Sequence, residues 1–126
     1  MEKTLVDIST YLELAGAEVG TFGPKPTSVE GNQQEAARAL FKSADGTMEI
    51  GIWECTPGRF TADRTHASEI CYIISGRVEM RSVDGTPREL GPGDLRALPQ
   101  GWEGEWRLIE RTRKLYVIHT TAKRPK

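Results

Sequence analysis

The sequence predicts an all-β protein: a single small domain folded as a jelly-roll barrel, preceded by an extended N-terminal arm. At 126 residues, the chain can bury about two-thirds of its unfolded surface around one core, without a disulfide or a metal. About eight short segments of strand-like composition follow one another closely, and helical periodicity is almost absent. Gly, Pro and Asp-Gly turn signals separate these segments, as they do in β-sandwiches and barrels.

The N-terminal arm is predicted to cover residues 1–35, followed by the barrel at 36–121 and a basic tail at 122–126. Residues 16–32 are dense in Gly, Pro, Thr and Ser, which favours an extended chain wrapped around the domain. The stretch from Asp7 to Leu14 is expected to form a short helical turn. No internal repeat divides the chain, so one barrel is expected.

Turn residues delimit the predicted strands. Asp45-Gly46 predicts the clearest hairpin, because Asp-Gly between two apolar runs favours a tight turn. Gly76 and Asp84-Gly85 are expected to end the strands beside them. The strands predicted in this way cover residues 37–43, 47–55, 70–75, 77–83, 95–98, 105–109 and 114–120.

Composition argues against nucleic-acid and membrane partners. Lys and Arg number 17 against 18 Asp and Glu, so there is no positive field to hold a polyanion. No apolar run is long enough to span a bilayer and no leader pattern opens the sequence, so a cytoplasmic location is expected. Cys55 and Cys71 do not form a CxxC motif and lie in strand-like segments, which favours two buried, unbridged thiols.

Two motifs carry the functional information. Glycines and a proline set their spacing: Gly58 and Gly76 in the first, and Gly93, Pro99 and Gly101 in the second. The first motif contains Arg64-Thr65-His66 and, three residues after His66, Glu69. This spacing resembles the cupin superfamily. More narrowly, the sequence resembles the Cupin_3 family (DUF861) over about residues 36–120. The segments that carry this resemblance are GIWECTPGRF, SEICYIISGRV and GDLRALPQGWEGEW.

The resemblance implies kinship with the cupin domains of ureidoglycine aminohydrolase and of an ethanolamine-utilisation protein. It also implies a barrel in which histidines and a glutamate hold a divalent metal such as Zn, Mn, Ni or Fe. His66 and Glu69 match two of those ligand positions, but Arg64 and Gly104 stand where the other two histidines would be. We therefore expect no full metal site and no cofactor. If a metal binds, the expected ligands are His66, Glu69 and His119.

Strand alternation predicts which side chains point into the barrel, because residues two apart share a face. If Glu69 points inward, as the motif's glutamate does, Cys71 points inward with it. The opposite face carries Ile70, Tyr72 and Ile74. That face is too apolar for water, so it is expected to meet another sheet or a second subunit, and a homodimer is predicted.

The second-motif strand is expected to carry aromatic side chains where the metal ligand is missing. Trp102 and Trp106 share the face of Gly104, because they lie two residues to either side of it. Replacing an imidazole by hydrogen leaves room, which an indole can fill. The sequence therefore predicts a metal site converted into an aromatic-lined cavity.

The expected pocket combines two candidate catalytic residues with several candidate ligand contacts. Glu69 and His66 are the candidate acid or base, since burial raises the pKa of a carboxyl group towards neutrality. The candidate ligand contacts are Arg64, Trp53, Cys71, Trp102 and Trp106. Arg64 either neutralises Glu69 or clamps a substrate carboxylate.

Structural roles are the alternative for each of these residues. Glu69 would then be a carboxylate held by Arg59, Arg64 or Arg107, since a buried charge needs a partner. His66 would be a surface residue and His119 a hydrogen-bonded structural residue, and the tryptophans would belong to the core. For Glu69 and Arg64 neither interpretation is favoured, whereas for the two histidines and the tryptophans the structural role is the favoured one.

Three functions follow from these observations. The leading hypothesis is a cupin that binds a small molecule without a full metal site; if it is an enzyme, isomerase, dehydratase or aminohydrolase-like chemistry fits. The second is a metal-dependent cupin enzyme that uses His66 and Glu69. The third is a non-catalytic sensor or interaction module that associates through the face of Ile70.

Overall fold

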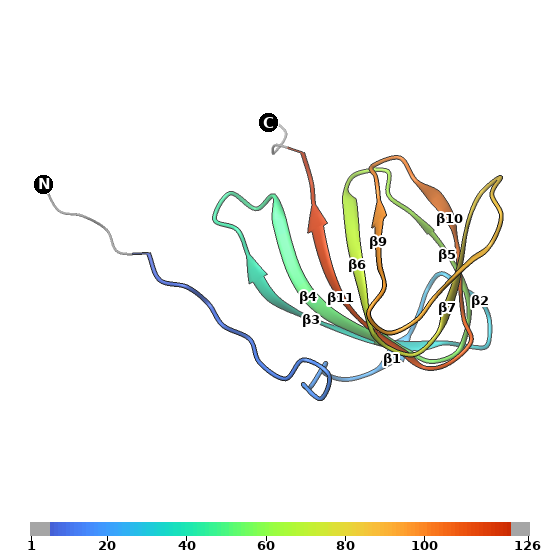
Figure 1. The fold of residues 1–126 in the computed structure, drawn as a ribbon, viewed down its shortest axis with the longest axis horizontal. Coiled ribbons are helices and arrows are strands. Elements are labelled where there is room, and N and C mark those ends of the chain that lie inside the picture. The colour runs from blue at the N-terminus through green and yellow to red at the C-terminus, as the bar shows by residue number, and fades with distance from the viewer. Residues whose placement is uncertain (1–5, 122–126) are drawn as a thin grey trace, which may run out of the picture.

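The computed structural model describes residues 6–121, which form two antiparallel sheets packed against each other (Figure 1). The predicted all-β class is confirmed, because every regular element in this range is a strand. No helix in the range is long and apolar enough to cross a membrane. The predicted basic tail at 122–126 lies outside the described residues.

The two sheets contain six and five strands. The larger sheet has the order β1 (Gly23–Pro24), β3 (Gln34–Lys42), β4 (Met48–Cys55), β11 (Thr112–His119), β6 (Ser68–Ser75) and β9 (Leu95–Leu98). The smaller sheet has the order β2 (Ser28–Glu30), β5 (Gly58–Asp63), β10 (Glu103–Leu108), β7 (Val78–Ser82) and β8 (Arg88–Leu90).

Several elements differ from the prediction. Strand β5 was not predicted, because only Phe60 and Ala62 of its residues pack with the core. Strands β1 and β2 and the start of β3 lie within the segment predicted as an arm. The helical turn predicted from Asp7 to Leu14 is wrong: this stretch has no regular structure, and a single turn begins at Leu14. So short a segment gains too few hydrogen bonds to offset helix nucleation.

An aromatic cluster fills the space between the sheets. Trp53 of β4, Phe60 of β5 and Trp106 of β10 meet with ring centroids 5.6 to 6.0 Å apart. The Phe60 and Trp106 rings are stacked, and Trp53 meets both edge-on. Trp106 is fully buried, so this cluster forms the base on which the site described below is built.

The N-terminal segment covers one end of the outer face of the six-stranded sheet. Val19 is buried there against Ile52, and Ile74 packs beside them. Arg113 fixes the segment by donating from Nη1 to the carbonyl oxygens of Leu14 and Ala17, at 2.7 and 2.6 Å. Of the three residues expected on an exposed face, Ile70 and Tyr72 are exposed, whereas Ile74 is half-buried beneath this segment.

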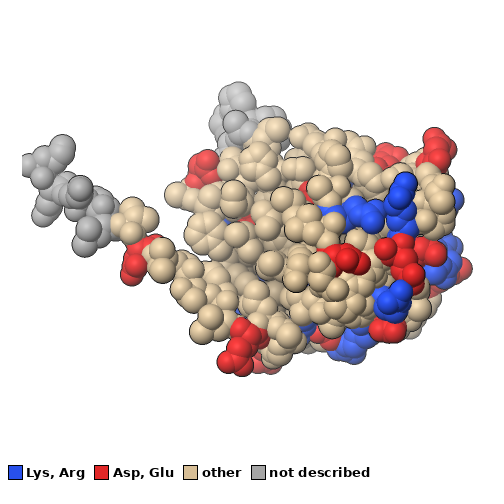
Figure 2. All heavy atoms as spheres, in the orientation of Figure 1, with Lys and Arg blue, Asp and Glu red and all other residues tan. Residues whose placement is uncertain are grey.

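Charged side chains of both signs gather over the five-stranded sheet. Figure 2 shows acidic and basic residues intermixed on the right-hand side of the molecule, while much of the remaining visible face is uncharged. Ion pairs such as Arg59 with Glu105 and Arg81 with Glu105 connect neighbouring strands here. No surface of a single sign is visible from this side.

Candidate functional site

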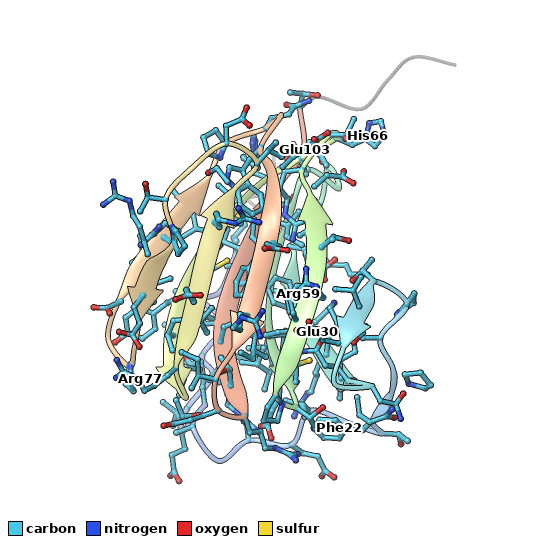
Figure 3. The ribbon with its side chains drawn as sticks, turned by 90° about the vertical axis from the view of Figure 1, so that its right-hand side faces the viewer. Phe22, Glu30, Arg59, His66, Arg77 and Glu103 are labelled. Carbon is cyan, nitrogen blue, oxygen red and sulfur yellow. The ribbon has the colours of Figure 1, made fainter. Side chains whose placement is uncertain are left out.

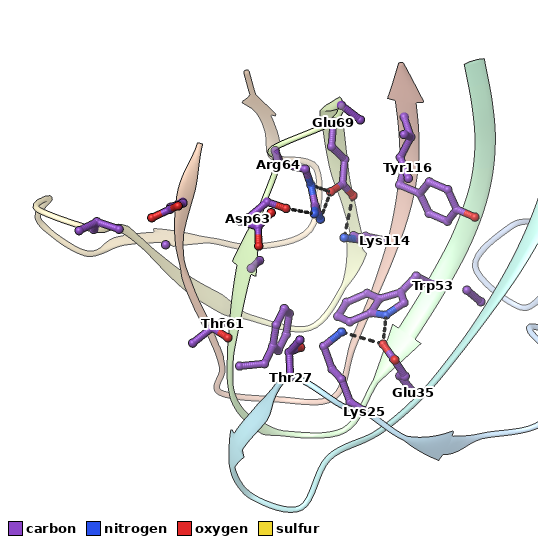
Figure 4. Close-up of a pocket in the computed structure, with 18 residues that line it drawn as sticks. Lys25, Thr27, Glu35, Trp53, Thr61, Asp63, Arg64, Glu69, Lys114 and Tyr116 are labelled. Carbon is purple, nitrogen blue, oxygen red and sulfur yellow. Dashed lines mark hydrogen bonds and ion pairs between the residues drawn. The ribbon is translucent and has the colours of Figure 1, made fainter. Parts of the chain in front are cut away.

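A cavity of about 730 Å³ opens between the two sheets beside Trp53 (Figure 4). This volume lies in the range typical of sites for small organic ligands. Strands from both sheets and the segment around Lys25 form the wall. The residues that matter for its chemistry are Lys25, Glu35, Ala37, Trp53, Phe60, Arg64, Glu69 and Lys114.

Glu69 points into the cavity, as the resemblance to the cupin motif implies, and is only 2% exposed. Its Oε2 accepts a hydrogen bond from Lys114 Nζ at 2.8 Å. Its Oε1 accepts from Arg64, with Nε at 2.8 Å and Nη2 at 2.5 Å. Of the two roles considered for Arg64, the structure shows that it neutralises Glu69.

The pKa of Glu69 differs from the expectation. Burial would raise it, but the charges of Lys114 and Arg64, together with their hydrogen bonds, lower the pKa to about 2. The expectation of a carboxyl group that titrates near neutrality is therefore wrong, because it considered burial without the two cations. Glu69 is a fixed anion near pH 7.

Lys114 is the main residue of the site that the sequence analysis missed. It lies on β11, is 6% exposed, and its Nζ lies 4.5 Å from the Trp53 ring centroid and 4.3 Å from that of Trp106. Aromatic faces stabilise an ammonium group that has lost most of its water. The sequence does contain a signal for Lys114, because this lysine lies in the apolar segment KLYVI. Strand alternation places Lys114 on the same face as Tyr116.

A second ion pair lies at the edge of the cavity. Glu35 Oε1 accepts from Lys25 Nζ and from Trp53 Nε1, each at 2.8 Å. Lys25 Nζ also lies 4.3 Å from the Phe60 ring centroid. Lys25 and Glu35 fall in the segment predicted as an arm, so composition alone did not indicate that they belong to the site.

The other candidate ligand contacts lie at different depths. Trp53 lines the cavity, whereas Trp106 and Cys71 are buried beneath it in the core. Burial raises the pKa of the Cys71 thiol to about 12, although Lys114 opposes the shift, so this group is neutral. Cys55 and Cys71 are both free and buried, as predicted.

Trp102 occupies the space expected to be left by the missing histidine. A Cβ atom on Gly104 would lie 2.5 Å from Cζ2 of Trp102 and 2.1 Å from the backbone oxygen of Arg81. The indole Nε1 donates to Ser82 Oγ at 2.8 Å, which fixes the ring. Trp102 lines a separate, smaller cavity rather than the one beside Trp53.

The two histidines lie away from the cavity. His66 is exposed on the connection between β5 and β6 and projects from the end of the sandwich (Figure 3). His119 is exposed on β11, next to Ile118, which pairs with Glu69. Since neighbouring residues of a strand face opposite ways, His119 points away from Glu69.

These positions do not fit the expected metal ligands. His66, Glu69 and His119 are not brought together, and Lys114 and Arg64 occupy both oxygens of Glu69. Among residues 6–121, no group of three or more His, Cys, Asp and Glu side chains has a metal-binding arrangement. The charges beside Glu69 are supplied by the protein itself.

The lowered pKa of Glu69 predicts a specific loss of stability in acid. Its contribution is fully present above the unfolded pKa of about 4.5 and is lost as the pH falls through the folded pKa of about 2. Glu69→Gln cannot show this contribution. The difference in unfolding free energy between wild type and Glu69→Gln should therefore shrink by about 3 kcal/mol between pH 5 and pH 2.

Urea unfolding at several pH values measures this difference. The comparison with Glu69→Gln matters because other carboxyl groups, including Glu35 and Glu54, also have lowered pKa values and are common to both proteins. A difference that stays constant across this pH range would contradict the ionised state assigned to Glu69.

Sequence comparison agrees with the motif spacing. A family model described as an EutQ-like cupin domain, Cupin_3, matches residues 42–116, which include both motifs. The chain belongs to the Cupin_3 family. Its cupin domain therefore has the fold that the resemblance implied. A comparison with the curated proteins found no match.

Solved cupin structures share this fold. A DUF861 family protein from Pseudomonas syringae is 24% identical with a TM-score of 0.68, over 79% of this chain and 45% of that one. Clostridium difficile EutQ is 21% identical with a TM-score of 0.61, over 70% of this chain and 64% of that one. A Salmonella typhimurium protein described as ethanolamine utilization protein q is 22% identical with a TM-score of 0.61, over 80% of this chain and 98% of that one.

At these identities the neighbours show the fold alone. This cupin spans less than two-thirds of the length of the Clostridium difficile chain. The expected kinship with ureidoglycine aminohydrolase is not tested by these comparisons and stays a prediction.

Proposed function

We propose that this cupin binds a small organic molecule in the cavity beside Trp53 without a full metal site. The observation that carries the proposal is the wall of the cavity, where aromatic faces lie beside charged groups already held by ion pairs. Trp53 and Phe60 offer apolar surface to a ligand. Lys25 and Lys114 each have ammonium hydrogens beyond those donated to Glu35 and Glu69. These remaining hydrogens can orient the ligand.

The role that fits Glu69 is positioning. As a fixed anion it holds Lys114 and Arg64 at the cavity and has no proton to give at neutral pH. If an isomerase, dehydratase or aminohydrolase-like reaction follows binding, we assign proton transfer to Lys114, whose ammonium group borders the cavity. The metal-dependent alternative is not supported by the positions of His66 and His119.

Filling the cavity should abolish ligand binding. Ala37 pairs with Trp53 across β3 and β4 and lines the cavity, so Ala37→Trp places an indole where the ligand would lie. We expect compounds that raise the melting temperature of wild type, found with a panel of small organic acids, amines and ring compounds, to leave this variant unchanged. The matched control is Lys42→Trp, exposed at the end of the same strand and outside the cavity. Equal shifts in Ala37→Trp and wild type, or no shift from any compound, would contradict the proposal.

We also propose that a second copy of the chain covers the outer face of the six-stranded sheet. One row across five strands on this face runs through Phe41, Ile50, Val117, Ile70 and Ala97. The row contains no polar side chain, although its members at β3 and β6 are 38% and 42% exposed. An uncharged row of this kind is complementary to the same row of a second copy under two-fold symmetry.

The arm supplies a second reason to choose a copy of this chain as the partner. Val6, Ile8 and Leu12 are 91%, 85% and 75% exposed, and they lie on a segment without regular secondary structure. This segment leads away from its own barrel in Figure 1, so its apolar side chains lack cover from the same chain. We infer that they lie on the partner's sheet.

A charge on this face should prevent the dimer. We expect sedimentation to give a dimer for wild type and a monomer for Ile70→Lys, because the variant would bury an unpaired ammonium group. Glu79→Lys is the control, since Glu79 lies on β7 of the other sheet, one residue from the buried Met80 and facing away from the core. A wild type that stays monomeric at high concentration would overturn this interface and, with it, the interaction-module hypothesis.

A further inference from the structure

A second, smaller cavity of about 170 Å³ lies where the free edges of the two sheets meet. Strand β8 ends the five-stranded sheet and β9 ends the six-stranded sheet, and both contribute to the wall. This cavity shares no lining residue with the one beside Trp53. The lining residues used below are Arg88 of β8, Arg96 of β9, Ser82 and Trp102.

Two arginines occupy positions that normally hold core residues. Arg88 pairs with Met80, which is 3% exposed, and Arg96 pairs with Cys71, which is 1% exposed. Paired residues of neighbouring strands share a face, so both arginines extend into the seam between the sheets. Arg96 is half-buried, and Arg88 is exposed at the rim.

No carboxylate balances these two charges. Neither Arg88 nor Arg96 has an acidic group within 4 Å in the described part of the chain, and neither donates a side-chain hydrogen bond there. Arg81, at the same cavity, is by contrast held by Glu105. Two like charges that extend into one small space repel each other unless an anion lies between them.

The other walls suit an oxyanion. The Trp102 ring closes one side, and its Nε1 donates to Ser82 Oγ, so the Ser82 hydroxyl hydrogen remains available to a ligand. The planar guanidinium groups can each donate two parallel hydrogen bonds to a carboxylate or a phosphate. The volume admits a small group and excludes a large organic ligand.

We propose that this seam binds a small oxyanion, a carboxylate or a phosphate group, between Arg88 and Arg96. The site is independent of the cavity beside Trp53, and it does not depend on the function proposed for that cavity. An anion in the seam joins the free edges of the two sheets through a pair of charges that otherwise repel.

Calorimetry and Trp102 fluorescence in low-salt buffer test the proposal, with inorganic phosphate and acetate titrated separately. We expect wild type to bind at least one of the two, and Arg88→Gln and Arg96→Gln each to weaken binding by about ten-fold or more. Arg107→Gln, at an exposed arginine that pairs with Glu30 outside this cavity, is the matched control and should bind as wild type does. The fluorescence change should be absent in Trp102→Phe.

A thermal measurement separates this site from general salt effects. Without an anion, Arg96→Gln should melt at or above the wild-type temperature, because it removes a repulsion. When phosphate or acetate is added, the melting temperature of wild type should rise more than that of Arg96→Gln. Binding of phosphate alone or of acetate alone would tell which oxyanion the site prefers. Failure of wild type to bind either phosphate or acetate would overturn the proposal. Equal rises in melting temperature in wild type, Arg88→Gln and Arg96→Gln would also overturn it.

Discussion

Replacing Lys114 by Met is expected to lower the free energy of unfolding by about 3 kcal/mol at pH 7. Glu69 is 2% exposed and accepts from Lys114 and Arg64, so the variant leaves a buried carboxylate with one partner instead of two. Its pKa should rise, since the opposing charge of Lys114 no longer offsets burial. Urea unfolding followed by tryptophan fluorescence measures the change.

The control for this prediction is Lys42→Met. Lys42 lies at the exposed end of β3, so its loss should change stability by no more than about 0.5 kcal/mol. In the double variant Lys114→Met, Glu69→Gln, the total loss should be smaller than the sum of the single losses, because both remove one interaction. A cost for Lys114→Met no greater than that of the control would contradict the buried pair.

Placing histidine at position 104 is expected to destabilise the domain by about 2 kcal/mol or more and to create no metal site. Any Cβ atom there would lie 2.1 Å from the backbone oxygen of Arg81 and 2.5 Å from the Trp102 ring. Backbone cannot yield as a flexible side chain can, so the strand must shift. Urea unfolding gives the cost, and elemental analysis after incubation with Zn²⁺ or Ni²⁺ gives the metal content.

Gly23→His serves as the comparison for Gly104→His. A Cβ atom on Gly23 meets nothing within 4 Å, so this variant measures the effect of the added side chain without a clash. Stoichiometric metal in Gly104→His at wild-type stability would show that the second-motif position still faces an open metal site. That outcome would contradict the conversion of this position into indole packing.

The inward direction of Glu69 was expected from the resemblance to the cupin motif, and the strand period of two then places its neighbours without knowledge of the adjacent strands. The same alternation placed Cys71 inside and Ile70 outside, as the structure confirms. Lys114 could not be assigned to the site in this way. Its contact with Glu69 depends on the pairing of β11 with β6, two strands more than 30 residues apart in the chain.

Other residues of the site also depend on strand pairing and packing that the sequence pattern does not reveal. Composition predicted an arm up to residue 35, yet Lys25 and Glu35 belong to the cavity because β1 pairs with β3. Alternation grouped Trp102 with Trp106, but one ring borders the second cavity and the other is buried in the core. Trp102 precedes β10, which begins at Glu103, so strand alternation does not fix its direction.

Lys114, and not a metal ion, is the cation that pairs with Glu69 Oε2. A high-resolution crystal structure of protein purified without chelators and incubated with Zn²⁺ tests this pairing most directly. We expect Lys114 Nζ within hydrogen-bonding distance of Glu69 Oε2 and no ion between them. A metal ion about 2.0 to 2.2 Å from a Glu69 oxygen, with Lys114 turned away, would contradict it.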